Sequence, residues 1–157
     1  MNPGKKWEKK FSRENPATII RLYDTTNGYV GIKNPCDFLL YSCPYFYPLE
    51  CKSVTGKRFY FSGLTDNQQN QLTQLDKKVG VISLVCVEFR QVQEAYAIPH
   101  RIIRELINEG KKSISHEYCN THHQIVNITF KQNGVIDWEL LLLKLNQLGG
   151  VLEGVEI

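Results

Sequence analysis

Hydrophobic residues recur along the chain at spacings that predict alternating helices and strands. Between residues 4 and 13, Trp7 and Phe11 stand four residues apart among lysines, which predicts a short amphipathic helix with both rings facing inward. Residues 81–89 are apolar almost throughout, as is typical of a central strand. Further strands, rich in β-branched and aromatic side chains, are predicted over residues 17–23, 37–41, 46–52, 94–98 and 125–130.

Three more helices follow from apolar periodicity and from residues that start or stop helices. They are predicted over residues 65–78, 99–108 and 137–148. The resulting order, α-β-β-β-α-β-β-α-β-α, predicts an α/β fold with a mixed central β-sheet flanked by helices. The chain has 157 residues, the length of one domain, and we expect a single domain over residues 1–157.

Two of the predicted strands form a hairpin that brings charged side chains together. Residues 42–45 join them as a tight antiparallel connection. In a hairpin centred on Cys43 and Pro44, Asp37 lies opposite Glu50, and Lys52 shares a face with Glu50 because side chains alternate along a strand. Two carboxylates and one ammonium group are therefore expected at one end of the sheet.

This group of residues suits a hard divalent cation such as Mg²⁺. Paired carboxylate oxygens, from Asp37 and Glu50, hold such an ion, and the backbone carbonyl of Cys51 is a candidate third ligand. The ion would activate water and stabilise charge on a phosphate, while Lys52 orients the water or neutralises the developing charge. A salt-bridge cluster at a sheet edge explains the same three residues, and the spacing leaves both interpretations open.

Composition and charge exclude several classes of protein. The chain is 42% hydrophobic, which argues against disorder, yet no apolar run approaches the roughly 18 residues that span a bilayer. The first residues carry no signal-peptide pattern, and the five cysteines include no Cys-x-x-Cys pair, so we expect a cytoplasmic protein with reduced thiols. The net charge of +3 is uneven, with the excess of lysine and arginine in residues 1–131. A basic body permits DNA as a partner, although a solvated surface explains it equally well.

Several segments combine into a longer pattern. They are residues 4–11 with Glu8 inside the first helix, residues 36–38, residues 49–53, the pair Gln68-Gln69, Gly80 with the strand ending at Phe89, residues 96–99 and residues 110–114. In this combination, roughly residues 4–118 resemble the PD-(D/E)xK nucleases, and among them the RecU-type Holliday-junction resolvases of Gram-positive bacteria and their phages.

The resemblance implies a restriction-endonuclease-like core and a role for each matching residue. Asp37 and Glu50 would be metal ligands, Lys52 the catalytic lysine, and Glu8 would face the metal directly or through water. Gln69 would support the lysine or contact the phosphate, although helix phase decides between Gln68 and Gln69. The alternatives are an exposed Glu8 paired with nearby lysines and two solvated glutamines.

The implied activity is a metal-dependent, structure-selective DNA endonuclease in a bacterial cell. With Mg²⁺, or alternatively Mn²⁺, it would resolve four-way junctions by paired symmetric nicks, which calls for a two-fold homodimer. The interface is expected in residues 140–148 or at a sheet edge. A nuclease acting on other DNA, as in repair or restriction, and a non-catalytic DNA-binding module remain as alternatives.

Two departures from the family pattern concern the segment before Asp37. Residues 34–36, Asn-Pro-Cys, stand where the family usually carries a hydroxyl residue. The bacterial resolvases also insert a long stalk between the first helix and this aspartate. Residues 23–33 leave room for a short stub at most, so the stalk is expected to be short or absent.

Candidate DNA contacts and a possible zinc cluster complete the sequence prediction. Basic residues that would contact the DNA backbone are Lys5, Lys6, Lys9 and Lys10 in the first helix, and Lys57 and Arg58 before an aromatic run. In that run, Phe59 and Phe61 are expected to face the core. The segment containing His116, Cys119, His122 and His123 offers zinc-ligand types, but without a second ligand pair we favour a polar loop.

Overall fold

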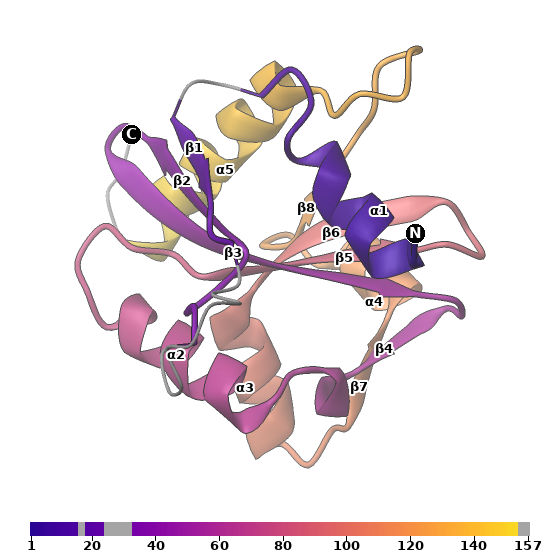
Figure 1. Cartoon of the computed structure of the whole chain (residues 1–157). Coiled ribbons are helices and arrows are strands. Elements are labelled where there is room, and N and C mark those ends of the chain that lie inside the picture. Colours follow the sequence, from indigo (N-terminus) through magenta and orange to yellow (C-terminus); the bar gives the residue numbers. More distant parts are fainter. Residues whose placement is uncertain (16–17, 24–32, 154–157) are drawn as a thin grey trace.

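A six-stranded central sheet organises the structure, a computed structural model that describes residues 1–15, 18–23 and 33–153 (Figure 1). In spatial order its strands are β1 (Ile19–Arg21), β2 (Phe38–Ser42), β3 (Tyr45–Val54), β5 (Leu84–Phe89), β6 (Glu94–Pro99) and β8 (Val126–Asn127). The β3–β5 pair is parallel and the other pairs are antiparallel. The predicted mixed central sheet is therefore confirmed.

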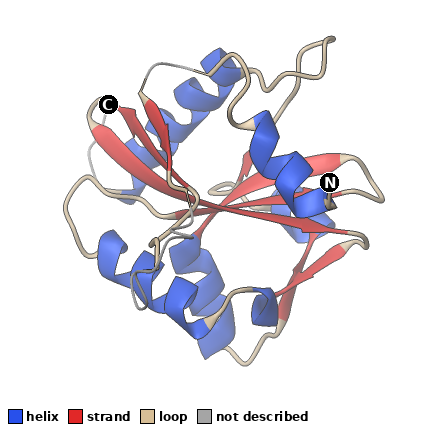
Figure 2. Cartoon of the chain, in the orientation of Figure 1, coloured by secondary structure: helices blue, strands red, loops and turns tan. Residues whose placement is uncertain are grey.

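Helices cover both faces of this sheet (Figure 2). They are α1 (Pro3–Lys10), α2 (Asp66–Asp76), α3 (His100–Asn108), α4 (His116–Thr121) and α5 (Trp138–Leu152), with a short 3-10 turn, η1 (Phe61–Gly63). Helices α1 and α5 pack on one face, and α2 and α3 pack on the other (Figure 1). Among the described residues, no helix is long and apolar enough to cross a membrane.

The α1 face of the sheet is closed by aromatic side chains. Trp7 and Phe11 are both fully buried, as predicted, and the Trp7 indole Nε1 donates to the Cys86 carbonyl oxygen at 2.8 Å. Trp138 and the buried leucines of α5 complete this layer. Each large apolar side chain that is removed from water contributes about 1.5–3 kcal/mol of transfer free energy, so α1 is fixed firmly to the sheet.

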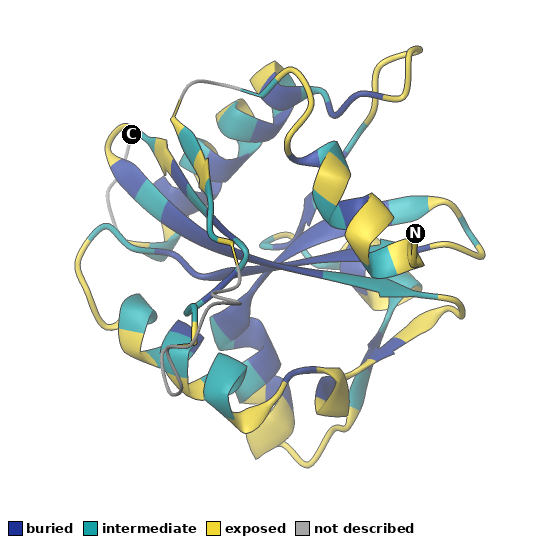
Figure 3. Cartoon of the chain, in the orientation of Figure 1, coloured by how far each residue is buried: buried dark blue, intermediate teal, exposed yellow. Residues whose placement is uncertain are grey.

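The α2 face has its own core, in which Leu72 packs with Val85 and Val87 of the central strand. Figure 3 shows the buried strands between helices whose outer faces are exposed. Helix α2 begins at a capping box: the Thr65 hydroxyl accepts from the Gln68 amide, and the Gln68 side chain accepts from the Thr65 amide. This start places the side chain of Gln68 within hydrogen-bond distance of Glu50 and Lys52 in β3.

Three features differ from the sequence prediction. Strands β4 (Arg58–Tyr60) and β7 (Ser113–Ser115) pair with each other as a two-stranded ribbon that was not predicted. The strand predicted over residues 125–130 is only two residues long, because after the Ile128 amide donates to the Ala95 carbonyl the chain leaves β6 and Phe130 pairs with Ile136 instead. The stub that was expected in place of a stalk falls mainly on residues 24–32, which lie outside the described residues.

Candidate active site

The β2–β3 hairpin has the register that the sequence predicted. Ser42 pairs with Tyr45 and Phe38 with Leu49, so the next position along sets Asp37 opposite Glu50. The Asp37 amide donates to the Leu49 carbonyl at 2.9 Å, and its carboxylate accepts from the Cys51 amide at 2.7 Å. Asp37 is therefore fixed to β3 through both its backbone and its side chain.

Glu50 and Lys52 meet a glutamine of α2 in a closed triangle of polar contacts. The Lys52 ammonium lies 3.4 Å from Glu50 Oε1 and donates to Gln68 Oε1 at 3.2 Å. Gln68 Nε2 donates to Glu50 Oε1 at 2.6 Å. Glu50 is only 3% exposed, so these contacts replace water around its carboxylate. The triangle holds Lys52 in one position beside the carboxylate.

Helix phase separates the two glutamines that the sequence left as alternatives. Gln68 faces Glu50 and Lys52, whereas Gln69 lies against the ring of the fully buried His100. Burial lowers the pKa of His100 to about 4, so its ring is neutral and Nε2 donates to the Gln69 amide oxygen. The structure thus does not bring Gln69 to the carboxylates. The sequence signal for Gln68 was its place three residues after Thr65, in the capping box.

Electrostatics make Glu50 a favourable place for a cation. Burial, followed by the negative charge of Asp37, raises the pKa of Glu50 to about 7, and Lys52 opposes this rise only in part. A positive ion beside the two carboxylates would offset both the free-energy cost of burying the Glu50 charge and its repulsion from Asp37. Burial also raises the pKa of the Cys36 thiol to about 12 and raises the pKa of the Cys51 thiol, so neither supplies a thiolate ligand.

The donor set therefore fits a hard cation with oxygen ligands. No group of three or more His, Cys, Asp or Glu side chains among the described residues is arranged to hold a metal ion. The two carboxylates and the Cys51 carbonyl would leave several positions of an octahedral shell open. Mg²⁺ commonly fills such positions with waters and a substrate phosphate.

Glu8 lies at the edge of this group and is paired with a cation. Its carboxylate accepts from Arg21 Nη2 at 3.1 Å, and Arg21 lies within 5.9 Å of the Phe38 ring in β2. In the alternative interpretation Glu8 paired with nearby lysines, but its partner is an arginine of β1. Glu8 remains close enough for its charge to add to the raised pKa of Glu50. No pattern in the sequence marks Arg21 as the partner of Glu8.

The basic residues predicted to contact DNA lie in two places. In α1, Lys5, Lys6 and Lys9 are exposed. Lys10 is instead engaged, 3.6 Å from Glu88 Oε1 and 5.0 Å from the centre of the Phe130 ring. Lys57 and Arg58 are exposed at the start of β4. Two sets of cations are thus open to solvent.

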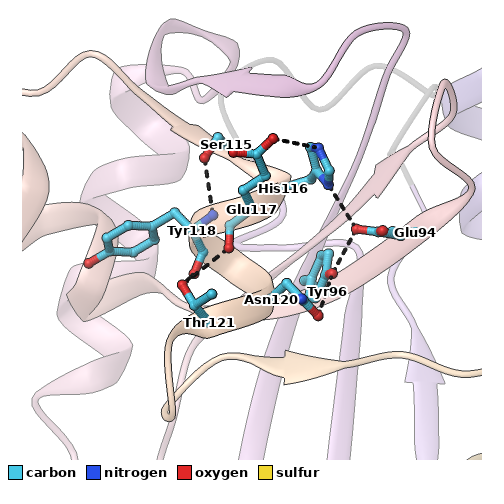
Figure 4. Close-up of polar contacts among 8 residues, drawn as sticks. All are labelled: Glu94, Tyr96, Ser115, His116, Glu117, Tyr118, Asn120 and Thr121. Carbon is cyan, nitrogen blue, oxygen red and sulfur yellow. Dashed lines mark hydrogen bonds and ion pairs between the residues drawn. The ribbon is translucent and has the colours of Figure 1, made fainter.

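The histidine-rich segment forms α4, where a polar loop was predicted (Figure 4). The Ser115 hydroxyl caps this helix by accepting from the Tyr118 amide at 3.1 Å. His116 faces Glu94, while Cys119 points into the core and is 1% exposed. His122 and His123 stack on each other with ring centres 5.1 Å apart. This arrangement gives no support to a zinc site.

Among solved structures, the chain is similar to Hjc, a Holliday junction resolvase from the archaeal hyperthermophile Archaeoglobus fulgidus, with 16% sequence identity over 78% of this chain and 84% of that chain and a TM-score of 0.47. No curated protein sequence matches the chain. The family model described as "RecU: Recombination protein U" matches residues 10–142. Because this match covers most of the chain and includes the hairpin with its carboxylates, the chain belongs to the RecU family.

Proposed function

We propose that this chain is a metal-dependent endonuclease that resolves four-way DNA junctions in a bacterial cell. Membership of the RecU family supports this activity. The observation that carries the proposal is the buried triangle of Glu50, Lys52 and Gln68 beside Asp37. A salt bridge that served only stability would gain little from a second carboxylate, which raises the pKa of Glu50 instead of lowering it.

In this proposal Asp37, Glu50 and the Cys51 carbonyl hold Mg²⁺ or Mn²⁺. Such an ion supplies a water of lowered pKa and stabilises negative charge on the phosphate. Lys52, oriented by Glu50 and Gln68, holds the attacking water or a phosphate oxygen with its ammonium group. Gln68 is a positioning residue because it acts through Lys52.

Residues around the triangle take supporting roles. Glu8, held by Arg21, adds negative charge at the edge of the site and would reach the cation through water. The exposed cations Lys5, Lys6 and Lys9 of α1, with Lys57 and Arg58 of β4, would contact phosphates of the DNA arms. Lys10 is less available because it already faces Glu88 and Phe130.

Two symmetric nicks require two active sites related by a two-fold axis, so we propose a homodimer. The interface was expected in residues 140–148 or at a sheet edge, yet Leu141, Leu145 and Leu148 pack inside the chain's own core. Leu143 and Val151 are the exposed apolar residues of α5, at 57% and 63%. The dimer therefore rests on the geometry of paired cleavage.

Cleavage of a synthetic four-way junction tests the proposed activity. With Mg²⁺ the wild-type chain should make paired nicks, and EDTA should stop them. Glu50→Gln and Lys52→Gln should each reduce the single-turnover rate by at least about 100-fold, whereas Glu139→Gln, an exposed carboxylate of α5, should cut normally. Normal cutting by either active-site variant would contradict the proposal. Preferential cutting of linear duplex would favour a repair or restriction role, and binding without cutting would favour a DNA-binding module.

A further inference from the structure

A surface groove begins one residue beyond Lys52 on β3. It has a volume of about 650 Å³ and is lined by residues 53–60, Ser62, Gly63 and Arg90. These residues form the end of β3, the turn into β4, β4 itself and η1 (Figure 1). Arg90, the residue directly after β5, completes the lining. The groove thus continues directly from the strand that carries Glu50 and Lys52.

The charge in this groove has a single sign. Its lining includes three cations, Lys57, Arg58 and Arg90, and no carboxylate. Arg58 Nε donates to the Ser113 hydroxyl at 3.0 Å, and Arg90 donates to the Thr55 hydroxyl at 2.7 Å. Bonds to neutral hydroxyls hold the two guanidinium groups in place without neutralising them. A polyanion is therefore the ligand class that the groove favours.

An exposed aromatic ring lies among these cations. Tyr60 is 57% exposed, although its neighbours Phe59 and Phe61 are 1% and 5% exposed. Phe59 and Phe61 anchor the segment in the core, and the alternation of β4 puts Arg58 and Tyr60 on its outer side. Figure 3 shows this exposed strand next to the buried sheet. An aromatic ring beside positive charges is the arrangement with which proteins stack bases of single strands.

The ribbon that carries Tyr60 is held rigidly. Phe59 pairs with the buried Ile114 of β7, and the His116 amide donates to the Lys57 carbonyl at 3.0 Å. The His116 ring contacts Glu94, which also accepts from the Tyr96 hydroxyl at 2.7 Å (Figure 4). Because the backbone of the groove is fixed in advance, a ligand loses little free energy in ordering it.

We propose that this groove binds a single DNA strand, with phosphates on Lys57, Arg58 and Arg90 and one unpaired base stacked on Tyr60. The inference rests on the proposed function in taking DNA as the substrate, and it deepens it. A fully paired duplex does not present a free base face to Tyr60, whereas the unpaired bases at an opened branch point do. The groove would then select strands with unpaired bases next to the site of cleavage.

Binding measured without divalent metal tests the stacking contact separately from cleavage. The probe is a fluorescein-labelled oligothymidylate of about 10 nucleotides in EDTA, followed by fluorescence anisotropy. Tyr60→Ala should raise the Kd for this probe by at least about fivefold. Tyr60→Phe, whose ring can still stack, should bind with a Kd within about twofold of the wild-type value. Tyr41→Ala removes another exposed tyrosine, 45% exposed on β2, and should bind normally.

A second pair of variants tests the groove itself. A Cβ at Gly56, in the turn between β3 and β4, would meet no atom within 4 Å, so the fold tolerates a side chain there. Gly56→Glu should weaken oligothymidylate binding by repulsion, and Gly56→Ala should not. Lys57→Ala should reduce the steepness of the slope of log K against log salt concentration by about 0.7. Lys131→Ala, which removes an exposed lysine elsewhere, should leave this slope unchanged.

Two results would overturn the proposal. One is wild-type affinity for oligothymidylate in Tyr60→Ala with an unchanged melting temperature. The other is an equal loss of affinity for a fully paired duplex of the same length, which would make Tyr60 a general backbone contact. Cleavage does not enter these measurements, so failure of the chain to cut a junction would sink the proposed function and leave the groove standing. Normal cutting with no effect of Tyr60→Ala on binding would do the reverse.

Discussion

Glu50 and Glu94 stand in the same sheet with similar partners, yet in opposite electrostatic conditions. Each carboxylate accepts a hydrogen bond from a neutral side chain, Gln68 or Tyr96, and lies next to a basic residue, Lys52 or His116. The Glu50 side chain is 4% exposed, whereas that of Glu94 is 36% exposed. Burial, together with Asp37, raises the pKa of Glu50 to about 7. The hydrogen bond from the Tyr96 hydroxyl lowers the pKa of Glu94, and His116 adds to this.

The difference separates a carboxylate that a bound cation would stabilise from one that its protein neighbours already stabilise. Glu94 accepts enough hydrogen bonds to stabilise its negative charge and remains partly in water, so it needs no cation to stabilise it. Glu50 has lost water and faces a second carboxylate, so its single ammonium partner leaves it incompletely neutralised. The pairwise contacts alone would class the two groups together. The surroundings, namely burial and the neighbouring acid, are what separate them.

The largest effect is expected from removing the second carboxylate. Asp37→Asn keeps an oxygen that can accept from the Cys51 amide but loses the charge that would hold a cation. Junction cleavage with Mg²⁺ should fall by about 10²–10³-fold in single-turnover experiments. Glu94→Gln is the matched change in the other group and should alter the rate by no more than about twofold. Equal losses in the two variants would show that Asp37 acts through stability, and melting temperatures would identify that case.

Gln68→Ala should produce the next largest effect, a fall in cleavage of about 10–100-fold, because Lys52 loses one of its two orienting partners. Gln69→Ala should leave the rate unchanged. It should instead lower the free energy of unfolding by about 1–3 kcal/mol, because the buried Nε2 of His100 loses its acceptor. Cleavage rates and urea unfolding of both variants check this. A slow Gln69→Ala with normal stability would restore the original choice of Gln69.

The contrast between Gln68 and Gln69 shows what the sequence could and could not predict at this site. Asp37, Glu50 and Lys52 were predicted to converge because a tight hairpin fixes register within a few residues. Which of the two glutamines faces the carboxylates depends on the rotation of α2 relative to β3. That rotation is set by packing between elements that are distant in the sequence. The capping box over Thr65 and Gln68 was the local signal available, and it was visible in the sequence.

A similar limit applied to the fold. The central strand and the α1 face were predicted because long apolar runs and the Trp7–Phe11 spacing are local patterns. Strands β4 and β7 are three residues each, and their pairing joins Arg58 to Ser115, which lies 57 residues later in the chain. Neither segment is long enough to show the alternation of hydrophobic and polar residues that marks a strand. The predicted alternation of Phe59 and Phe61 was nevertheless confirmed, since both are buried.

Stability in EDTA should change in opposite directions for the two glutamates. The folded-state pKa of Glu50, about 7, lies above its ordinary value of 4.5, so its contribution favours folding below pH 4.5 and is lost as the pH rises through 7. At pH 8, Glu50→Gln should therefore raise the free energy of unfolding by about 1–3 kcal/mol. The gain should shrink towards pH 5. Urea unfolding at the two pH values measures it.

Glu94→Gln is the counterpart in the same experiment. Its folded-state pKa is lowered, so the carboxylate stabilises the fold above its ordinary pKa and that stabilisation is lost as the pH falls. Because the group is partly exposed, the loss at pH 8 should be below about 1 kcal/mol. Destabilisation by both variants at pH 8 would mean that Glu50 is fully neutralised by Lys52, and the comparison between the two sites would fail.

The smallest effect concerns His116, the basic partner of Glu94. His116→Phe keeps a ring beside Phe89, 6.2 Å away, but removes the contact with Glu94, and should lower the free energy of unfolding by about 1 kcal/mol. Because the backbone bond from residue 116 to Lys57 remains, oligothymidylate affinity should not change. Stoichiometric Zn²⁺ should leave the melting temperature of wild type and variant alike unaltered. A zinc-dependent rise in wild type that disappears in His116→Phe would instead make α4 a metal site, and Glu94 would no longer serve as the purely structural counterpart of Glu50.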